Sequence, residues 1–215
     1  MRDRYPGYDV LAKRNTPSWN EQTRRVIGAR MAIHPDEHKF FSDEEWLTVK
    51  AICRRIVPQP ADRAHPAPVA AMLDAKLASG QGDGYRDARL PHQGDAWRRG
   101  VSGFDGEALA RESAKFHELE PAKQDDILNA VHEGETQSNA WGDMPPKLFF
   151  KKRLLHDVVA AYYAHPAAWN EIGFGGPASP RGYVRLQPDR RDSWEAMEAR
   201  PGREEEARRE NARVG

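Results

Sequence analysis

A possible metal-binding motif lies near the N-terminus, at His34-Pro35-Asp36-Glu37-His38. This segment spells H-x-x-E-H, the inverted form of a zinc-peptidase motif. That chemistry requires both histidines on one face of a stable helix, with a further metal ligand elsewhere. The segment lacks the apolar face that would hold such a helix in a core, so we interpret it as a polar loop. A free-standing metal-dependent enzyme built on His34, Glu37 and His38 stays as an alternative hypothesis.

A second cluster, Gly173-Phe174-Gly175-Gly176, has the composition of a phosphate-binding loop. Phosphate-binding glycines follow a strand and open a helix, so that amides at the helix N-terminus meet the phosphates. Here the glycines follow a predicted helix and run into Pro177, which has no N–H. We therefore predict no nucleotide site.

The remaining reactive side chains show no catalytic spacing. The single cysteine, Cys53, lies in an apolar helical run and cannot form an internal disulfide, a CxxC metal knuckle or a haem attachment. The acidic runs, such as Asp125-Asp126, lie on polar faces and are typical of solubilising charge. We predict no catalytic, cofactor-binding or metal-binding residue in this chain.

Composition narrows the classes of function further. Lys and Arg total 33 and Asp and Glu total 33, so the basic excess that nucleic-acid binding requires is missing. No window approaches the roughly 18 apolar residues that span a bilayer. Thr23-Arg24-Arg25-Val26-Ile27 echoes a twin-arginine export signal, but the apolar run after it is too short. We therefore expect a cytoplasmic protein, with export to the periplasm alongside a partner as the alternative.

The fold class predicted from the pattern is all-α, because no segment shows strand alternation. We expect a compact bundle of about five to six helices, with an extended N-terminal arm and a C-terminal loop rich in Gly, Pro and aromatic residues. The expected organisation is an arm with one short helix at 1–39, a helical domain at 40–187 and a charged tail at 188–215. The tail is almost free of apolar residues, so we predict a solvated helix or disorder there.

Several helix boundaries can be predicted from caps and prolines. Ser42 and Glu45 form a capping box that opens a helix, which Pro58 ends. Further helices are expected at residues 19–31, 66–77 and 92–101, from Phe104 to about Leu119, and at 121–133.

The last long helix is expected to begin at Pro145-Pro146 and to end before Pro166. Its apolar stripe is wide and needs a covering surface, whereas charged residues take the opposite side. The predicted stripe is Leu148, Phe149, Leu155, Val158, Val159 and Tyr162, and the predicted polar side is Lys151, Lys152, Arg153 and Asp157.

The loop that follows is more aromatic than ordinary surface loops. Such a loop either folds back on its own domain or packs against another protein. We favour the second interpretation, because Trp, Tyr, Phe and Arg dominate binding energy at interfaces. The predicted partner-binding residues are Trp169, Ile172, Phe174, Gly175, Gly176, Pro177, Arg181 and Tyr183.

The same region resembles the gluconate 2-dehydrogenase subunit 3 family. The resemblance covers residues from about 40 to 183 and is strongest at its C-terminal end. It also extends to the helix that Ser42 caps and Pro58 ends. The matching positions near the C-terminal end are Phe149-Phe150, Tyr163, His165-Pro166, Trp169, Ile172-Gly173-Phe174 and Gly175.

The resemblance implies a small gamma subunit of an FAD-dependent sugar or polyol dehydrogenase. In such complexes a large flavoprotein of the glucose–methanol–choline (GMC) type holds the FAD and oxidises the alcohol carbon. The small chain is thought to stabilise the large one and to assist its maturation. The resemblance therefore implies FAD in the partner and none in this chain, and leaves open whether a cytochrome c subunit also joins the complex. A helical interaction module for another partner is a further alternative.

Overall fold

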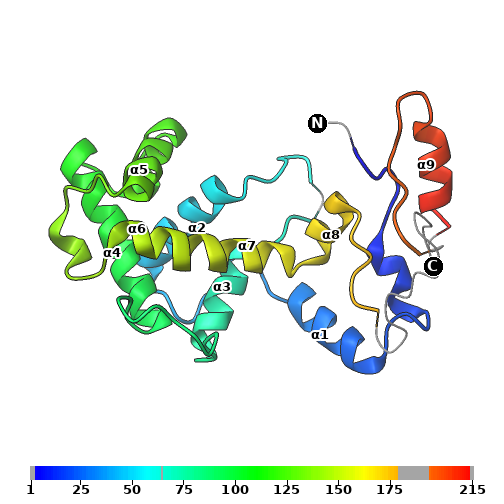
Figure 1. Cartoon of the computed structure of the whole chain (residues 1–215), viewed down its shortest axis with the longest axis horizontal. Helices are drawn as coiled ribbons and strands as arrows, with labels where there is room; N and C mark the ends of the chain where they lie inside the picture. Colours follow the sequence, from blue (N-terminus) through cyan, green and yellow to red (C-terminus); the bar gives the residue numbers. More distant parts are fainter. Residues whose placement is uncertain (1–2, 64, 179–193, 214–215) are drawn as a thin grey trace. The chain divides into compact units, whose positions relative to one another are not determined.

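A computed structural model of the chain describes residues 3–63, 65–178 and 194–213 (Figure 1). All regular structure in these residues is helical, which confirms the all-α prediction. None of their helices is both long and apolar enough to cross a membrane. The elements in chain order are η1 Val10–Asn15, α1 Glu21–Met31, α2 Asp43–Ile56, α3 Val69–Ala78, α4 Gln93–Glu112, η2 Phe116–Glu118, α5 Pro121–Glu133, η3 Asn139–Trp141, α6 Pro146–Phe149, η4 Phe150–Leu154, α7 Leu155–Tyr163, α8 Pro166–Ile172 and α9 Glu204–Asn211.

The chain divides into two compact units. Unit 1 comprises Met1–Ala32, His65–Ala67 and Tyr163–Gly215, and unit 2 comprises Ile33–Ala64 and Pro68–Tyr162. Unit 2 contains the helices from α2 to α7, and unit 1 contains the N-terminal and C-terminal segments of the chain.

Two helices of unit 2 begin where local chemistry predicts. The Ser42 side chain accepts from the amide of Glu45, and the Glu45 carboxylate accepts from the amide of Ser42, which completes the capping box of α2. Helix α5 spans the predicted residues 121–133, opened by Pro121 and ended by Gly134 in the left-handed conformation. In both cases the signal lies within one turn of the helix end.

Helix α4 corrects the sequence prediction. We expected one helix at 92–101 and another from Phe104, but residues 93–112 form a single helix. Its glycines weaken it as an isolated helix by about 1 kcal/mol each relative to alanine. They are required because a Cβ at Gly100 or Gly103 would lie within 3.0 Å of the Phe149 or Trp141 ring. The glycines therefore form a face that admits two aromatic rings against the helix backbone.

An aromatic core follows from this close approach. The ring of Phe149 packs edge-on against Trp97 at 5.6 Å between centroids and lies 6.0 Å from Trp141. Phe104 continues the chain of rings, 5.5 Å from both Trp141 and Phe116. Edge-to-face packing of this kind adds about 0.5–1.5 kcal/mol per pair beyond the burial of area. The rings thereby join α4 to η2, η3 and α6.

The last long helix contains a π-helical segment, η4, and two charged residues lie on its buried face. Buried residues recur there at intervals of four, at Phe149, Arg153 and Asp157 and at Phe150, Leu154 and Val158. Residues four apart share one face of a helix, so Arg153 and Asp157 lie beside the apolar residues of the core. The predicted polar side was therefore wrong for Arg153 and Asp157, which are buried. The predicted apolar Val159 is 37% exposed.

Buried carboxylates anchor the loops of unit 2. Asp74 accepts from the backbone amides of Lys39, Phe40 and Phe41, and so orients the chain that enters α2. Glu107 on α4 accepts from the amides of Gln137 and Ser138, at 2.8–3.0 Å. Each buried acid is satisfied by donors, as burial of a charge requires.

Cys53 is buried in α2. Burial raises the pKa of its thiol to about 12, so the reactive thiolate is scarce at neutral pH. The residue is core, as its apolar neighbours in the sequence predict.

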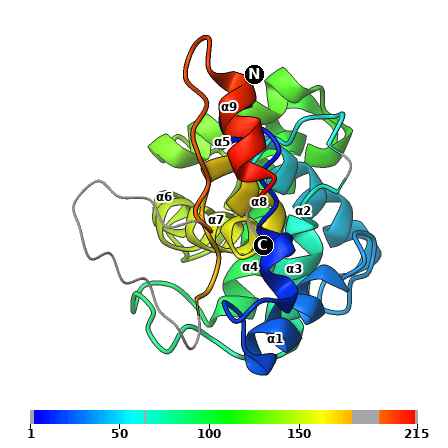
Figure 2. The same ribbon diagram turned by 90° about the vertical axis from the view of Figure 1, so that its right-hand side faces the viewer.

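Unit 1 corrects two further expectations. The N-terminal segment is not a bare extended arm, because it forms η1 and buries Tyr8, Val10 and Trp19. The charged tail contains helix α9, which is not solvated all round: Ala207 and Asn211 are buried. The Asn211 side chain donates to the Pro6 carbonyl at 3.0 Å, and Figures 1 and 2 show α9 beside the N-terminal segment.

Two acids on one helix allow a matched test of buried charge. Burial would raise the pKa of Glu107, but hydrogen bonds from Ser138, Gln137 and Trp141 outweigh it and hold the pKa below the usual range. Burial raises the pKa of Asp105, and hydrogen bonds from Thr48 and Phe116 offset this only in part. The folded state therefore favours the charged form of Glu107 and the neutral form of Asp105.

We predict that Glu107→Gln lowers the free energy of unfolding by about 2 kcal/mol at pH 7, because an amide N–H would face the donors at Gln137 and Arg111. A depressed pKa stabilises the fold above the unfolded value near 4.3 and ceases to do so as pH falls through the folded pKa, so the deficit should shrink in acid. The control Asp105→Asn should be neutral or stabilising at pH 7. Urea titrations across pH 3–7 check this, and equal losses in both variants at pH 7 would contradict it.

Candidate partner-binding surface

The segment predicted to be an aromatic loop begins with a helix, α8, at Pro166–Ile172. The sequence pattern had predicted a loop there. The His165 side chain accepts from the amide of Ala167, and Pro166 occupies the first helical position. The helix ends at Gly173 in the left-handed conformation, with φ of 66°. The amide of Phe174 then donates to the carbonyl of Trp169 at 2.9 Å, which closes the helix end. Because both ends of α8 are capped, the segment that follows it, residues 173–176, has a well-defined conformation. We call this segment the glycine turn.

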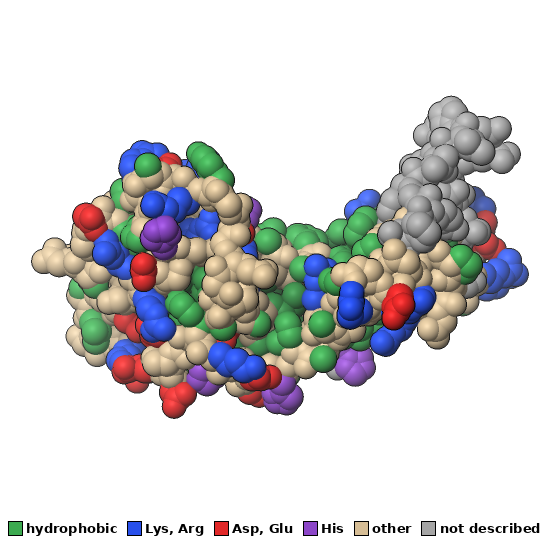
Figure 3. Space-filling view, turned by 90° about the horizontal axis from the view of Figure 1, so that it is seen from below, with side chains coloured by type: hydrophobic (Ala, Val, Ile, Leu, Met, Phe, Trp, Pro, Cys, Tyr) green, Lys and Arg blue, Asp and Glu red, His purple; other side chains and the backbone are tan. Residues whose placement is uncertain are grey.

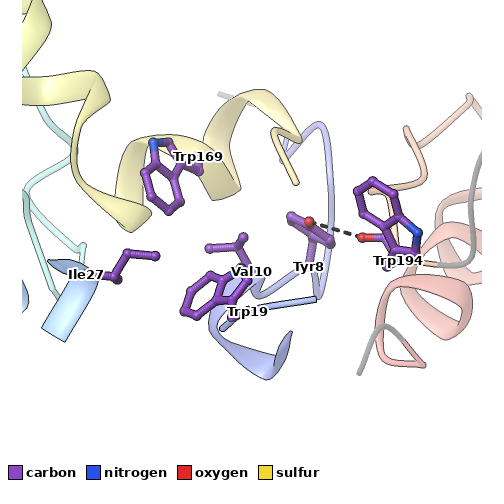
Figure 4. Close-up of a cluster of buried hydrophobic side chains, with 6 residues drawn as sticks. All are labelled: Tyr8, Val10, Trp19, Ile27, Trp169 and Trp194. Carbon is purple, nitrogen blue, oxygen red and sulfur yellow. Dashed lines mark hydrogen bonds between the residues drawn. The ribbon is translucent and has the colours of Figure 1, made fainter. Parts of the chain in front are cut away.

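Trp169 lies in the chain's own core. Its side chain is 3% exposed, and its indole N–H donates to the carbonyl of Tyr163 at 2.6 Å. The remaining rings and aliphatic side chains of the cluster come from both ends of the chain (Figure 4). They are Tyr8, Val10, Trp19, Ile27 and Trp194. The interpretation in which the loop folds back on its own domain therefore applies to Trp169.

The N-terminal segment holds the turn in place by three contacts. The amide of Val10 donates to the Asn170 side-chain oxygen at 2.8 Å. The Tyr5 ring lies against Gly173, where a Cβ would come within 2.5 Å of the ring. The Lys13 ammonium donates to the carbonyl of Gly175. Glycine is therefore required at position 173 for two reasons: the backbone has a positive φ, and the Tyr5 ring approaches it closely.

Lys13 is completely buried, which is rare for a lysine. Besides the Gly175 carbonyl, its ammonium lies 4.9 Å from the centre of the Trp194 ring, within range of a cation–π interaction. A buried ammonium needs such partners to offset its lost hydration. Lys13 therefore links the N-terminal segment, the glycine turn and the C-terminal segment within unit 1.

Three large side chains around Trp169 are exposed, and we call them the docking surface. Tyr163 is 46% exposed, Ile172 is 46% exposed and Phe174 is 43% exposed. The Phe174 ring packs edge-on against Trp169, with centroids 5.7 Å apart. Two of the predicted partner-binding residues, Ile172 and Phe174, are thus presented to the outside from a rigid support.

The other predicted partner-binding residues have different settings. Gly175 and Gly176 are buried, and Pro177 is half-buried. A Cβ at Gly176 would lie 3.0 Å from Val10 and 3.2 Å from Trp169. These glycines shape the turn and permit close packing. Arg181 and Tyr183 lie outside the described residues.

The H-x-x-E-H segment does not have the geometry of a zinc-peptidase site. Residues 34–38 form a turn outside any helix, with the Glu37 amide bonded to the His34 carbonyl. His38 stacks on Trp46 at 4.9 Å and bonds Asp43 at 2.9 Å. Across the described residues, the group of potential ligands close enough for one metal is instead Asp83, His156 and Asp157.

Sequence reasoning missed the residues that support the turn. Tyr5, Tyr8 and Val10 are apolar residues in an otherwise polar segment, and that contrast was the available signal that the segment packs against something. Lys13 and Trp194 had no local signal, because their roles arise only when the chain ends meet. Tyr163 was counted as part of a family motif and not as an exposed ring.

Charges of both signs are interspersed on the face of the molecule that Figure 3 shows. This matches the balanced composition and offers no extended basic area on that face.

The family model for gluconate 2-dehydrogenase subunit 3 matches residues 43–176. The chain therefore belongs to this family, whose name denotes a subunit of a multi-subunit dehydrogenase. The match ends within the glycine turn. Neither the comparison with curated proteins nor the comparison with solved structures gave a match.

The support of the turn can be tested with two glycines. Gly173 and Gly202 both have positive φ, at 66° and 79°, but only Gly173 has a ring against it. We predict that Gly202→Ala costs about 1 kcal/mol from backbone strain alone. Gly173→Ala should cost about 2–4 kcal/mol, because displacement of Tyr5 adds to the strain. Urea unfolding followed by tryptophan fluorescence measures both, and equal losses would show that Tyr5 does not press on the turn.

Proposed function

We propose that this chain is the non-catalytic small subunit of an FAD-dependent sugar or polyol dehydrogenase. In this proposal a large GMC-type subunit binds the FAD and oxidises the substrate's CH–OH group. The small chain stabilises the large one and assists its maturation. Family membership supports a place in a dehydrogenase complex, and the GMC-type partner is our inference from the resemblance of the sequence.

The observation that carries the proposal is the exposure of Ile172 and Phe174 on a capped, rigid turn. An interface gains most from large apolar side chains that are already held in place, because little conformational entropy is lost on binding. Asn170 and Lys13 fix the backbone on either side of these residues. The turn is therefore preorganised for insertion into a pocket of a partner protein.

The side chains of unit 2 support a structural role for this chain. Its buried acids Asp74 and Glu107 accept hydrogen bonds from backbone amides and thereby hold loops. Buried and fully satisfied carboxylates of this kind stabilise the fold and are poorly placed to exchange protons with a substrate. In the proposed complex, the reacting groups and the flavin belong to the large subunit.

The test is coexpression and copurification of this chain with GMC-type flavoproteins encoded in the same genome. We predict that the double variant Ile172→Ser, Phe174→Ser weakens binding of the large subunit by at least about 30-fold, since each hot-spot side chain contributes on the order of 2 kcal/mol. The matched control is Leu109→Ser, a similarly exposed apolar residue in unit 2, 51% exposed. Pull-down yield, bound flavin and dye-linked oxidation of a panel of sugars and polyols are the readouts.

Two results would contradict the proposal. One is an unchanged yield and flavin content for the double variant, with circular dichroism showing that the variant is folded. The other is a large subunit that acquires flavin and activity to the same extent without the small chain.

A further inference from the structure

A pocket of about 480 Å³ lies within unit 2. None of the residues that line it belongs to the docking surface. Its volume falls in the range of small-molecule sites, about 300–1,000 Å³. The loop between α3 and α4 forms one wall, and Arg153 on η4 closes another. Leu77 and Leu90 give the pocket an apolar part. The pocket therefore combines an apolar wall with charged groups.

The charges that line the pocket are mainly basic. Lys76, Arg86 and Arg153 face one acid, Asp83. The Arg153 side chain is 10% exposed and that of Lys76 is 33% exposed, so both cations are partly withdrawn from water. The Arg86 guanidinium donates to the Leu90 carbonyl at 2.6 Å and is held at the wall. Partly desolvated cations favour an anionic ligand.

Asp83 occupies the position that a ligand carboxylate would take. One of its oxygens lies 2.6 Å from the Lys76 ammonium, and the other lies 2.9 Å from the Arg153 guanidinium. Burial would raise the pKa of Asp83, but hydrogen bonds from Lys76 and Arg153 lower it further, and the pKa lies below its usual range. Asp83 is therefore charged at neutral pH and bridges the two cations.

The segment that carries Asp83 is rich in glycine. Asp83 stands between Gly82 and Gly84 and follows Gly80, and glycines permit many backbone conformations. A Cβ at Gly80 or Gly84 would meet nothing within 4 Å, so these two positions are open. A change of backbone conformation at these glycines would withdraw Asp83 from the two cations.

Asp157 holds the two cations in place when Asp83 is withdrawn. Its side chain is fully buried and lies 3.6 Å from Lys76 and 3.5 Å from Arg153. It also accepts from the Trp97 indole at 2.7 Å and from the Gln93 amide at 3.0 Å, which fix it to α4. Without Asp83, two positive charges would face one fixed negative charge. The site would then attract one further anion.

The same acids do not make a good metal site. Asp83, His156 and Asp157 offer ligand atoms within 4.8 Å of one another. A divalent cation among them would lie next to the Lys76 ammonium and the Arg153 guanidinium, which already neutralise both carboxylates. Repulsion between like charges opposes metal binding there.

We propose that this pocket binds a small organic carboxylate, whose carboxylate group replaces that of Asp83 between Lys76 and Arg153 and whose apolar part packs against Leu77 and Leu90. The side chain of Asp83 then acts as an internal competitor for the ligand. This assignment is independent of the docking surface and of the partner subunit.

The test is ligand-observed saturation-transfer NMR on the full chain in a buffer free of carboxylate and phosphate, with butyrate and its neutral amide butyramide as observed probes and inorganic phosphate added as a competitor of butyrate. We expect binding of butyrate, none of butyramide, and weaker binding of phosphate. Asp83→Ala should raise the affinity for butyrate on the order of tenfold, because the competitor is removed. Lys76→Met should lower it at least about tenfold, because one of the two cations is lost.

Lys76→Met is the main variant, because the Lys76 side chain is less buried than that of Arg153 and its loss disturbs the fold less. Arg153→Met is a second test once circular dichroism shows that the variant is folded. Lys123→Met is the matched control, since Lys123 pairs with Glu112 on the surface and lies outside the pocket. Unchanged butyrate affinity in Asp83→Ala, equal binding of butyramide, or equal loss in Lys123→Met would each overturn the proposal. Phosphate binding as strong as that of butyrate would also overturn it, because it would show a general anion site.

Discussion

The glycine face of α4 is the constraint on which unit 2 depends. A Cβ at Gly100 would overlap the Phe149 ring, and one at Gly103 would lie 2.5 Å from the Trp141 ring. With hydrogen at these positions, the two rings reach the backbone of the helix, and the aromatic chain from Trp97 to Phe116 can form. The helix gives up intrinsic stability at each glycine and regains it through tertiary packing. Elements far apart in sequence meet along this one helix.

In unit 1, the packing of the core is centred on Trp169. The family match includes Trp169 but not Tyr8, Val10, Trp19, Ile27 or Trp194, which surround it. In this chain, segments that flank the matched region therefore bury the tryptophan and hold the glycine turn. The aromatic character of the loop thus serves two purposes. Trp169 stabilises the chain itself, whereas Ile172 and Phe174 stay exposed on the turn that Trp169 supports.

A few buried charged side chains hold backbone segments in place. Asp74 and Glu107 accept from backbone amides, and Lys13 donates to a carbonyl and lies over an aromatic ring. The group at Asp157 differs from the others, because it joins side chains around a pocket and includes an acid on a glycine-rich loop. Buried networks whose members are all satisfied add rigidity, and in the proposed site the loop member, Asp83, is the one that a ligand carboxylate would replace.

The fold class, the family and those helix ends whose signals are local could be predicted from the amino-acid sequence. The capping box of α2 and the proline and glycine that bound α5 act within one turn, so neighbouring residues decide them. Family membership followed from the residues around the glycine turn, where backbone conformation and close packing restrict the choice of side chain.

The continuity of α4 and the burial of several side chains could be seen only in the tertiary structure. The continuity of α4 depends on rings that come from residues 141 and 149, and its own glycines predicted a break. The burial of Arg153 and Asp157 depends on partners from distant segments, since Asp157 bonds Trp97 and Gln93 of α4 and Arg153 pairs with Asp83. Trp169 is covered by residues from both ends of the chain, most of them more than a hundred residues earlier. Such contacts between distant residues, which no local pattern encodes, decide which side chains are left for a partner.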